Sequence, residues 1–142
     1  MADDAKKKAA ENARKRAQSA RYRKEGEAKQ ARYNKEQRKL ERLKTAKRAL
    51  DRQISKMQQF HSHVNSVASS VSSGSFKGTL EKKVQDNVKK LATDINSDIN
   101  HYQQAESSLN AKISSLEASQ GELMSAISSA FAVAEDFLKS LV

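Results

Sequence analysis

Apolar side chains recur at alternating steps of three and four residues along most of this chain, which is the spacing of a coiled-coil helix. In the first half, one apolar set returns at every seventh position: Leu43, Leu50, Met57, Val64 and Val71. A second, more mixed set interleaves with it: Tyr33, Leu40, Lys47, Ile54, His61 and Ala68. Together the two sets predict a helix over residues 33–72.

The second half carries a clearer pattern of the same kind. From Val88 to Leu141 the positions on one helical face are almost all apolar, with Glu106 and Gln120 as polar exceptions. The apolar members are Val88, Ala92, Ile95, Ile99, Tyr102, Leu109, Ile113, Leu116, Leu123, Ile127, Ala130, Ala134, Phe137 and Leu141. We therefore expect a second helix over residues 79–142.

The segment between the two patterns favours a reversal of the chain. Seven serines lie from Ser62 to Ser75, and Gly74 and Gly78 tolerate backbone conformations that other residues avoid. The 142 residues include no proline, so nothing else in the sequence forbids continuous helix. The predicted fold is all-α: a long antiparallel two-helix hairpin, coiled-coil-like, with its turn at residues 73–78.

Residues 1–32 differ from the rest of the first helix. Here the same register meets small or polar residues in both sets: Asn12, Ser19 and Gly26 in one, and Lys15, Tyr22, Lys29 and, just beyond, Glu36 in the other. Residues 1–56 hold 20 Lys and Arg against 8 Asp and Glu, whereas residues 57–142 hold 7 against 9. We expect residues 1–32 to form a basic arm, either a solvated helix or partly disordered, ahead of a hairpin at residues 33–142. Gly26 marks an expected weak point between the two.

Folding this hairpin at the predicted turn leaves the end of the second helix without a cover. From residue 123 onward the first helix would offer only the basic arm, which has no apolar stripe. Burying one large apolar side chain stabilises by about 1.5–3 kcal/mol, so several together favour a partner. We expect a protein-binding interface at Leu123, Ile127, Phe131, Phe137 and Leu141.

The sequence offers little for catalysis or for holding a metal or cofactor. His61 and His63 are two residues apart, so a helix would point their rings in different directions. Residues 94–100 resemble the start of a calcium loop, but Ile99 stands where the loop needs glycine and Ala105 where it needs glutamate. Cysteine, nucleophile motifs and phosphate-binding glycine loops are absent from the sequence. We expect no catalytic residue, no metal site and no cofactor.

A helix, then Phe76-Lys77-Gly78, then a second helix resembles the WxG family of small helical hairpins linked to bacterial type VII secretion. Phe76 stands where that family has tryptophan, and Gly78 where it has glycine. The stretch from Leu40 to Ile127 is also similar to the helical partner proteins encoded beside LXG-type toxins. The resemblance implies a non-enzymatic binding partner or targeting factor that pairs with the helical N-terminal domain of such a toxin. A second small helical partner is a further expectation.

Members of this family or their partners often carry an export signal on the second helix, an aromatic residue followed four positions later by an acid. Phe131 and Glu135 match that spacing. The simpler interpretation is that Phe131 packs on a partner and Glu135 faces water. The expected location is the cytoplasm, with export alongside the partner left open. The longest nearly apolar stretch, Ala130 to Ala134, is too short to enter a bilayer as a span.

The basic arm supports an alternative function. Its cations, at residues 6–8, 14–16 and 21–24, could neutralise the phosphates of a nucleic acid or ribosome, with Tyr22 and Tyr33 for stacking. Five glutamates interrupt this charge, however: Glu11, Glu25, Glu27, Glu36 and Glu41. We therefore favour a solvated helix face over a nucleic-acid site.

Overall fold

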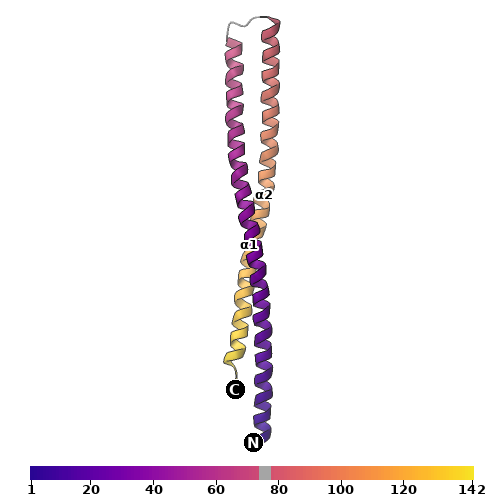
Figure 1. Cartoon of the computed structure of the whole chain (residues 1–142), viewed down its shortest axis with the longest axis vertical. Helices are drawn as coiled ribbons and strands as arrows, with labels where there is room; N and C mark the ends of the chain where they lie inside the picture. Colours follow the sequence, from indigo (N-terminus) through magenta and orange to yellow (C-terminus); the bar gives the residue numbers. More distant parts are fainter. Residues whose placement is uncertain (74–77) are drawn as a thin grey trace. The chain divides into compact units, whose positions relative to one another are not determined.

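The computed structural model describes residues 1–73 and 78–142. These residues form two helices, α1 (Ala2–Ser73) and α2 (Thr79–Lys139), and no strand lies among them. The two helices pack against each other and run in opposite directions (Figure 1). The predicted all-α antiparallel hairpin is confirmed, and α2 begins at the residue where the sequence placed it.

Gly78 is the described member of the predicted turn motif. Its φ of 114° lies in the region that residues with a side chain rarely adopt. Its carbonyl accepts a hydrogen bond from the Lys82 amide at 3.2 Å, so Gly78 leads directly into α2. The other two motif residues, Phe76 and Lys77, lie outside the described residues.

The N-terminal arm is helical from its second residue. Helix α1 runs from Ala2 through Gly26 and residues 32–33 to Ser73 without interruption. Of the two states expected for residues 1–32, the structure has the helix. The expected weak point at Gly26 is wrong, because Gly26 is buried within a continuous helix.

The chain divides into two compact units, each built from parts of both helices. Unit 1 contains residues 1–41 and 114–142, and unit 2 contains residues 42–113. Neither boundary falls at residue 33, where the sequence suggested that the arm ends and the hairpin begins. The basic arm is therefore part of the same unit as the C-terminal end of α2.

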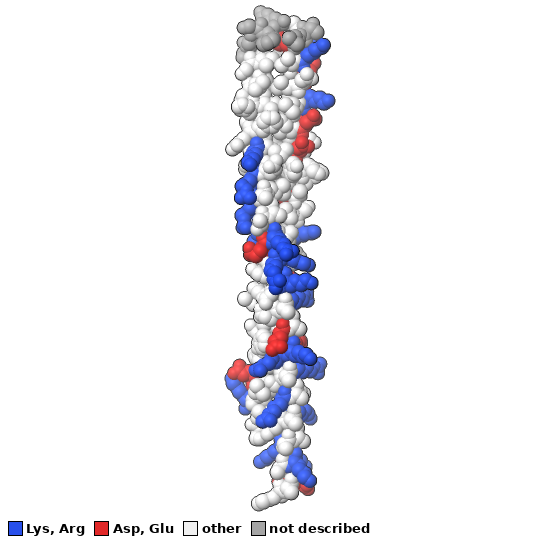
Figure 2. All heavy atoms as spheres, in the orientation of Figure 1, with Lys and Arg blue, Asp and Glu red and all other residues white. Residues whose placement is uncertain are grey.

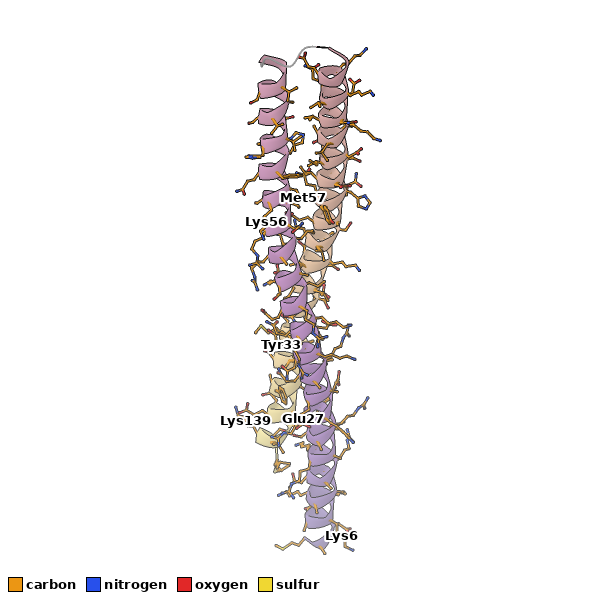
Figure 3. The ribbon with its side chains drawn as sticks, turned by 45° about the horizontal axis from the view of Figure 1, so that its top comes forward. Lys6, Glu27, Tyr33, Lys56, Met57 and Lys139 are labelled. Atoms are coloured by element: carbon orange, nitrogen blue, oxygen red, sulfur yellow. The ribbon has the colours of Figure 1, made fainter. Side chains whose placement is uncertain are left out.

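Unit 2 has the apolar core that the heptad pattern predicts. Val64, Ile95 and Ile99 are buried together, and the cluster is completed by half-buried apolar side chains: Met57, Val88 and Ala92. In Figure 3, Met57 lies on the side of α1 that faces α2, whereas the neighbouring Lys56 points away from it. One stripe on each helix is thus enough to form this core.

One layer of the unit 2 core is polar. Glu106, a polar exception in the pattern of α2, lies beside Asp51 of α1. A hydrogen bond with Asp51, partial desolvation and repulsion from the Asp51 charge all raise the pKa of Glu106, while Lys47 acts in the opposite direction. Two carboxyl groups face each other here, with one cation beside them.

Unit 1 buries the apolar stripe of α2 against a stripe of small and polar residues on α1. On this part of α1 the buried and half-buried residues are Gln18, Gln37 and those of the extended register: Asn12, Lys15, Ser19, Tyr22, Gly26, Lys29, Tyr33, Glu36 and Leu40. On α2 the buried residues include Leu123, Ile127, Ala130 and Ala134. Figure 1 shows the C-terminal part of α2 (yellow) alongside the N-terminal part of α1 (indigo). The expectation that this end of α2 lacks an intramolecular cover is wrong.

Candidate protein-binding surface

The predicted interface residues do not form one exposed surface. Leu123 and Ile127 are each only 8 % exposed and face α1 within unit 1. Phe137 and Leu141 are half-buried. Phe131 alone remains exposed, at 36 %. The five residues were grouped because the basic arm seemed unable to cover them, and that physical premise fails.

Aromatic stacking contributes to the cover. The ring of Phe137 stacks on that of Tyr22, with ring centroids 5.8 Å apart and an interplanar angle of 20°. Stacked aromatic pairs stabilise by about 0.5–1.5 kcal/mol beyond the area that they bury. Tyr22 was considered in the sequence as a stacking residue for nucleic acid, but in unit 1 its ring is engaged with Phe137.

Side chains of α1 also hold the backbone of the C-terminal segment. The buried Ser19 hydroxyl donates to the Ala134 carbonyl at 2.8 Å. Lys15 Nζ donates to the Ser140 carbonyl at 2.6 Å. Asn12 forms two hydrogen bonds with Val142, donating to its carbonyl at 2.7 Å and accepting from its amide at 2.9 Å. The polar character of this part of α1 is therefore used to bind the end of α2.

A second group of polar contacts lies further along the same unit. Gln120 donates from Nε2 to the Tyr33 carbonyl at 3.2 Å, and Ser119 Oγ donates to a Glu36 carboxylate oxygen at 3.2 Å. Gln120, the second polar exception in the pattern of α2, is thus satisfied by α1.

Gly26 allows Phe131 to approach the backbone of α1. A Cβ atom built on Gly26 would lie 3.1 Å from the Phe131 Cζ atom and 3.2 Å from both Cε atoms. These separations are shorter than ordinary van der Waals contacts between carbon atoms. The Phe131 ring therefore packs directly against the backbone at Gly26. The heptad pattern alone does not reveal this contact.

Three large apolar side chains of α2 remain exposed in unit 1. Met124 is 58 % exposed, Phe131 36 % and Leu138 38 %. They are seven residues apart, so they share one face of the helix beside the buried stripe. We refer to Met124, Phe131 and Leu138 as the exposed stripe.

Cations of α1 lie next to this stripe. A shallow groove beside Leu138 is lined on α1 by Arg16, Ser19, Ala20, Arg23, Lys24 and Glu27. Among the residues that the structure describes, Arg16, Arg23 and Lys24 have no ion-pair partner. Figure 2 shows Lys and Arg interspersed with Asp and Glu on the visible face of unit 1, in its lower half. We refer to Arg16, Arg23 and Lys24 as the cation row.

The opposite edge of unit 1 has a different electrostatic character. A hollow there is lined by Tyr22, Glu25, Lys29, Ala126, Ser129, Ala130 and Val133. Lys29 forms an ion pair with Glu25 at 2.9 Å, and Lys15 forms one with Glu11 at 2.8 Å. The Lys15 ammonium lowers the pKa of Glu11, chiefly through its hydrogen bond. Charges on this edge are therefore matched within the chain.

The residues of the proposed export signal lie on neighbouring turns of α2. Phe131 belongs to the exposed stripe, and Glu135 is exposed and pairs with Lys139 at 2.9 Å. A hydrogen bond from Lys139 lowers the pKa of Glu135, and the same contact raises the pKa of Lys139. Both residues are accessible near the end of α2, and their use as a signal stays a prediction.

Residues 1–11 extend past the last hydrogen bond between α1 and the C-terminal segment. Asn12 is the first residue that bonds the C-terminal end, and residues 1–11 are all exposed. Lys6 lies in this overhang (Figure 3). The overhang holds three lysines, Lys6 to Lys8, and three acids, Asp3, Asp4 and Glu11, so its side chains carry no excess charge.

In the described part of the chain, no three His, Cys, Asp or Glu side chains are grouped so that they could hold a metal ion. Neither helix contains, among its described residues, an apolar stretch of the length that a bilayer requires.

Comparisons with known proteins give no relative for this chain: no family model, no curated protein and no solved structure matches it.

Proposed function

We propose that this chain is a non-enzymatic binding partner and targeting factor for the helical N-terminal domain of an LXG-type toxin of type VII secretion. The observation that supports binding to a helical protein is the exposed stripe of Met124, Phe131 and Leu138. A two-helix hairpin covers one stripe on each helix, and a further apolar stripe with the same spacing favours a third helix. The resemblance of the Phe76-Lys77-Gly78 hairpin to the WxG family supplies the class of partner.

We also propose that Phe131 and Glu135 form an export signal and that the chain is located in the cytoplasm. Phe131 and Glu135 would be recognised in the cytoplasm, and the chain would leave the cell with its toxin or remain behind. A second small helical partner would complete the bundle. No step of this function uses a catalytic residue or cofactor.

The test is co-expression of the chain with the N-terminal helical domain of an LXG-type toxin from the same gene neighbourhood, with an affinity tag on the toxin domain. We expect a stable complex on affinity and size-exclusion columns at 0.15 M salt, with a defined molar ratio by light scattering. An unrelated helical hairpin of similar length and charge serves as the control. The absence of a complex, or equal capture of the control, would refute the proposal.

The alternative, nucleic-acid binding through the basic arm, makes a separate prediction. Binding through phosphates falls steeply with salt, by close to one unit of logarithmic slope for each phosphate neutralised. Deleting residues 1–32 is a poor test, because it would uncover Leu123, Ile127 and Ala134. Replacing exposed Lys6, Lys7 and Lys8 by glutamine leaves that cover in place and removes half of the overhang's charges.

A further inference from the structure

We propose that the groove between the exposed stripe and the cation row is the docking site for one amphipathic helix of the partner that carries Asp and Glu beside its apolar face. This inference rests on the proposed function and specifies where and how the toxin domain binds. It also replaces the interface expected from the sequence, of which only Phe131 belongs to the exposed stripe.

The spacing of the stripe specifies a helical occupant. Met124 and Leu138 are 14 residues apart, which is about 21 Å along a helix at 1.5 Å per residue. Side chains repeating every seven residues match the knobs-into-holes spacing of another helix and not the period of two of a strand. A partner helix of about four turns would cover all three side chains.

The contact of Phe131 with α1 repeats that of Leu138 one heptad away. Leu138 lines the groove together with Ser19, and Phe131 lies against Gly26. Phe131 precedes Leu138 by seven residues, and Gly26 follows Ser19 by seven, so the two contacts are equivalent places one heptad apart. The absence of a side chain at Gly26 lets the Phe131 ring lie low against α1, where a third helix can pass over it.

Charge selects an acidic helix. The α1 residues that line the groove include three cations, Arg16, Arg23 and Lys24, and one carboxylate, Glu27. The three cations lack partners within the described chain, whereas Lys29 on the opposite edge is paired with Glu25. Carboxylates flanking the apolar face of a partner would pair with these cations and raise the association rate.

The stripe itself favours a protein over a nucleic acid. Phosphates would use the cation row and leave Met124 and Leu138 in water. Burial of these side chains favours association only against an apolar surface, which a phosphate backbone does not supply.

Unit 2 has exposed apolar residues of its own: Phe60, Val67, Leu91 and Tyr102. Val67 is 46 % exposed and lines a hollow with His63, Ser66, Ser70 and Val71. Among the described residues, no lysine or arginine lines that hollow. Charge complementarity therefore supports a docking site in unit 1.

The experiment compares two pairs of double variants against the co-expressed toxin domain. Met124→Asp with Leu138→Asp places charge on the stripe, and Ala118→Asp with Ala132→Asp makes the same charge change at exposed positions off the stripe. Arg16→Glu with Arg23→Glu reverses the cation row, and Arg14→Glu with Arg21→Glu is its exposed control. All four must keep the helical circular dichroism and thermal midpoint of the wild type to within a few degrees.

We expect the stripe variant to raise the dissociation constant about 100-fold or more and the cation-row variant about 10-fold or more, with controls within about 3-fold of wild type. If the wild type forms no complex, the proposed function fails. If the wild type binds and the stripe variant binds as well as its control, the docking site is wrong while the proposed function stands.

Two further measurements identify a wrong occupant. Binding of a 20-base-pair DNA duplex that is lost with the cation-row variant but kept by the stripe variant would assign the groove to nucleic acid. Sedimentation equilibrium showing a dimer of the wild type alone, lost with the stripe variant, would assign it to a second copy of this chain. Either result would overturn the inference.

Discussion

The two units of this hairpin bury the same kind of helix in opposite ways. In unit 2, both helices contribute aliphatic side chains, and Val64, Ile95 and Ile99 form a buried cluster. In unit 1, the aliphatic stripe of α2 lies against small and polar residues of α1, such as Ser19 and Gly26. An apolar stripe therefore does not need an apolar partner to be buried.

Different interactions hold the two interfaces together. Unit 2 depends on burial of apolar area, with one polar layer at Glu106. Unit 1 adds side-chain hydrogen bonds to the backbone of the other helix, from Ser19 to Ala134 and from Gln120 to Tyr33. A hydrogen bond of this kind stabilises by about 1 kcal/mol net, less than a large buried side chain. We expect unit 1 to be the more readily opened of the two.

The net charges of the two units differ less than those of residues 1–56 and 57–142. Unit 1 holds 15 Lys and Arg against 11 Asp and Glu, and unit 2 holds 12 against 6. The C-terminal acids of α2 therefore offset much of the basic arm within unit 1. Within unit 1, the cation row lies beside Leu138 of the exposed stripe.

The largest expected effect compares one isoleucine in each unit. Ile99→Ala should lower the free energy of unfolding by about 3 kcal/mol, because Ile99 packs among buried aliphatic side chains. Ile127→Ala should cost about 2 kcal/mol, near the lower limit for such changes, because the facing stripe of α1 is small and polar. Urea denaturation followed by circular dichroism gives both values.

Ser97→Ala, at an exposed position, is the control and should change the free energy of unfolding by less than about 0.5 kcal/mol. An equal or larger cost at Ile127 would mean that the two interfaces do not differ in this way.

The heptad rule and the structure predict opposite stability changes for the substitution Ser19→Leu. The rule favours an aliphatic residue at this position, so Ser19→Leu should stabilise the coiled coil. Ser19 is only 3 % exposed and its hydroxyl binds the carbonyl of Ala134, which is 2 % exposed, so a larger side chain here would press on α2. We expect a loss of about 1–3 kcal/mol from overpacking. Ser19→Ala should lose about 1 kcal/mol through the hydrogen bond alone. A rise in the unfolding midpoint of Ser19→Leu would contradict the packing described for unit 1.

Much of the fold could be predicted from the sequence because the heptad register is a local property. The face of α2 from Val88 to Leu141 is the buried face except at Tyr102, which is exposed, and Thr79 is where α2 begins. Even the register of residues 12–36 was correct: Asn12, Ser19 and Gly26 face α2. The pattern places residues on a face whether they are apolar or not.

The exposed surface of unit 1 could not be predicted from the sequence. It depends on how α1 covers the apolar stripe of α2 with small and polar side chains. Periodicity treats Ser19 as a break in a stripe, whereas its hydroxyl binds the Ala134 carbonyl. It treats Gly26 as a weak point, whereas the ring of Phe131 occupies the space beside it. Once α1 covers Leu123 and Ile127, only the residues beside the buried stripe remain available to a partner.

Two glycines provide a matched test of the role of Gly26. Gly121→Ala should raise the free energy of unfolding by about 1 kcal/mol, since alanine is the better helix former and no atom lies within 4 Å of the new methyl group. Gly26→Ala should gain far less or lose stability, because the methyl group would press on the Phe131 ring. Combining Gly26→Ala with Phe131→Ala should restore part of the helix-propensity gain, and a double-mutant cycle measures the coupling. Equal gains in the free energy of unfolding at the two glycines, with no coupling to Phe131, would show that the Phe131 ring does not pack against Gly26.

The smallest expected effect concerns the polar layer of unit 2. Because Asp51 raises the pKa of Glu106, the pair stabilises the folded chain when Glu106 is protonated. That contribution is fully present below the ordinary pKa of 4.5 and is lost as the pH rises through the raised value in the folded state. Above the raised pKa of Glu106, its charge is repelled by Asp51, with partial relief from Lys47. Glu106→Gln removes one charge and supplies an amide that donates to Asp51, so it should raise the thermal midpoint at pH 7. The difference in thermal midpoint from wild type should shrink towards pH 4, where the wild-type carboxyl also carries a proton.

Glu122→Gln, an exposed substitution in unit 1, should leave the midpoint unchanged at both pH values. A midpoint difference for Glu106→Gln that stays constant between pH 4 and pH 7 would show that repulsion between the two carboxylates is not its cause.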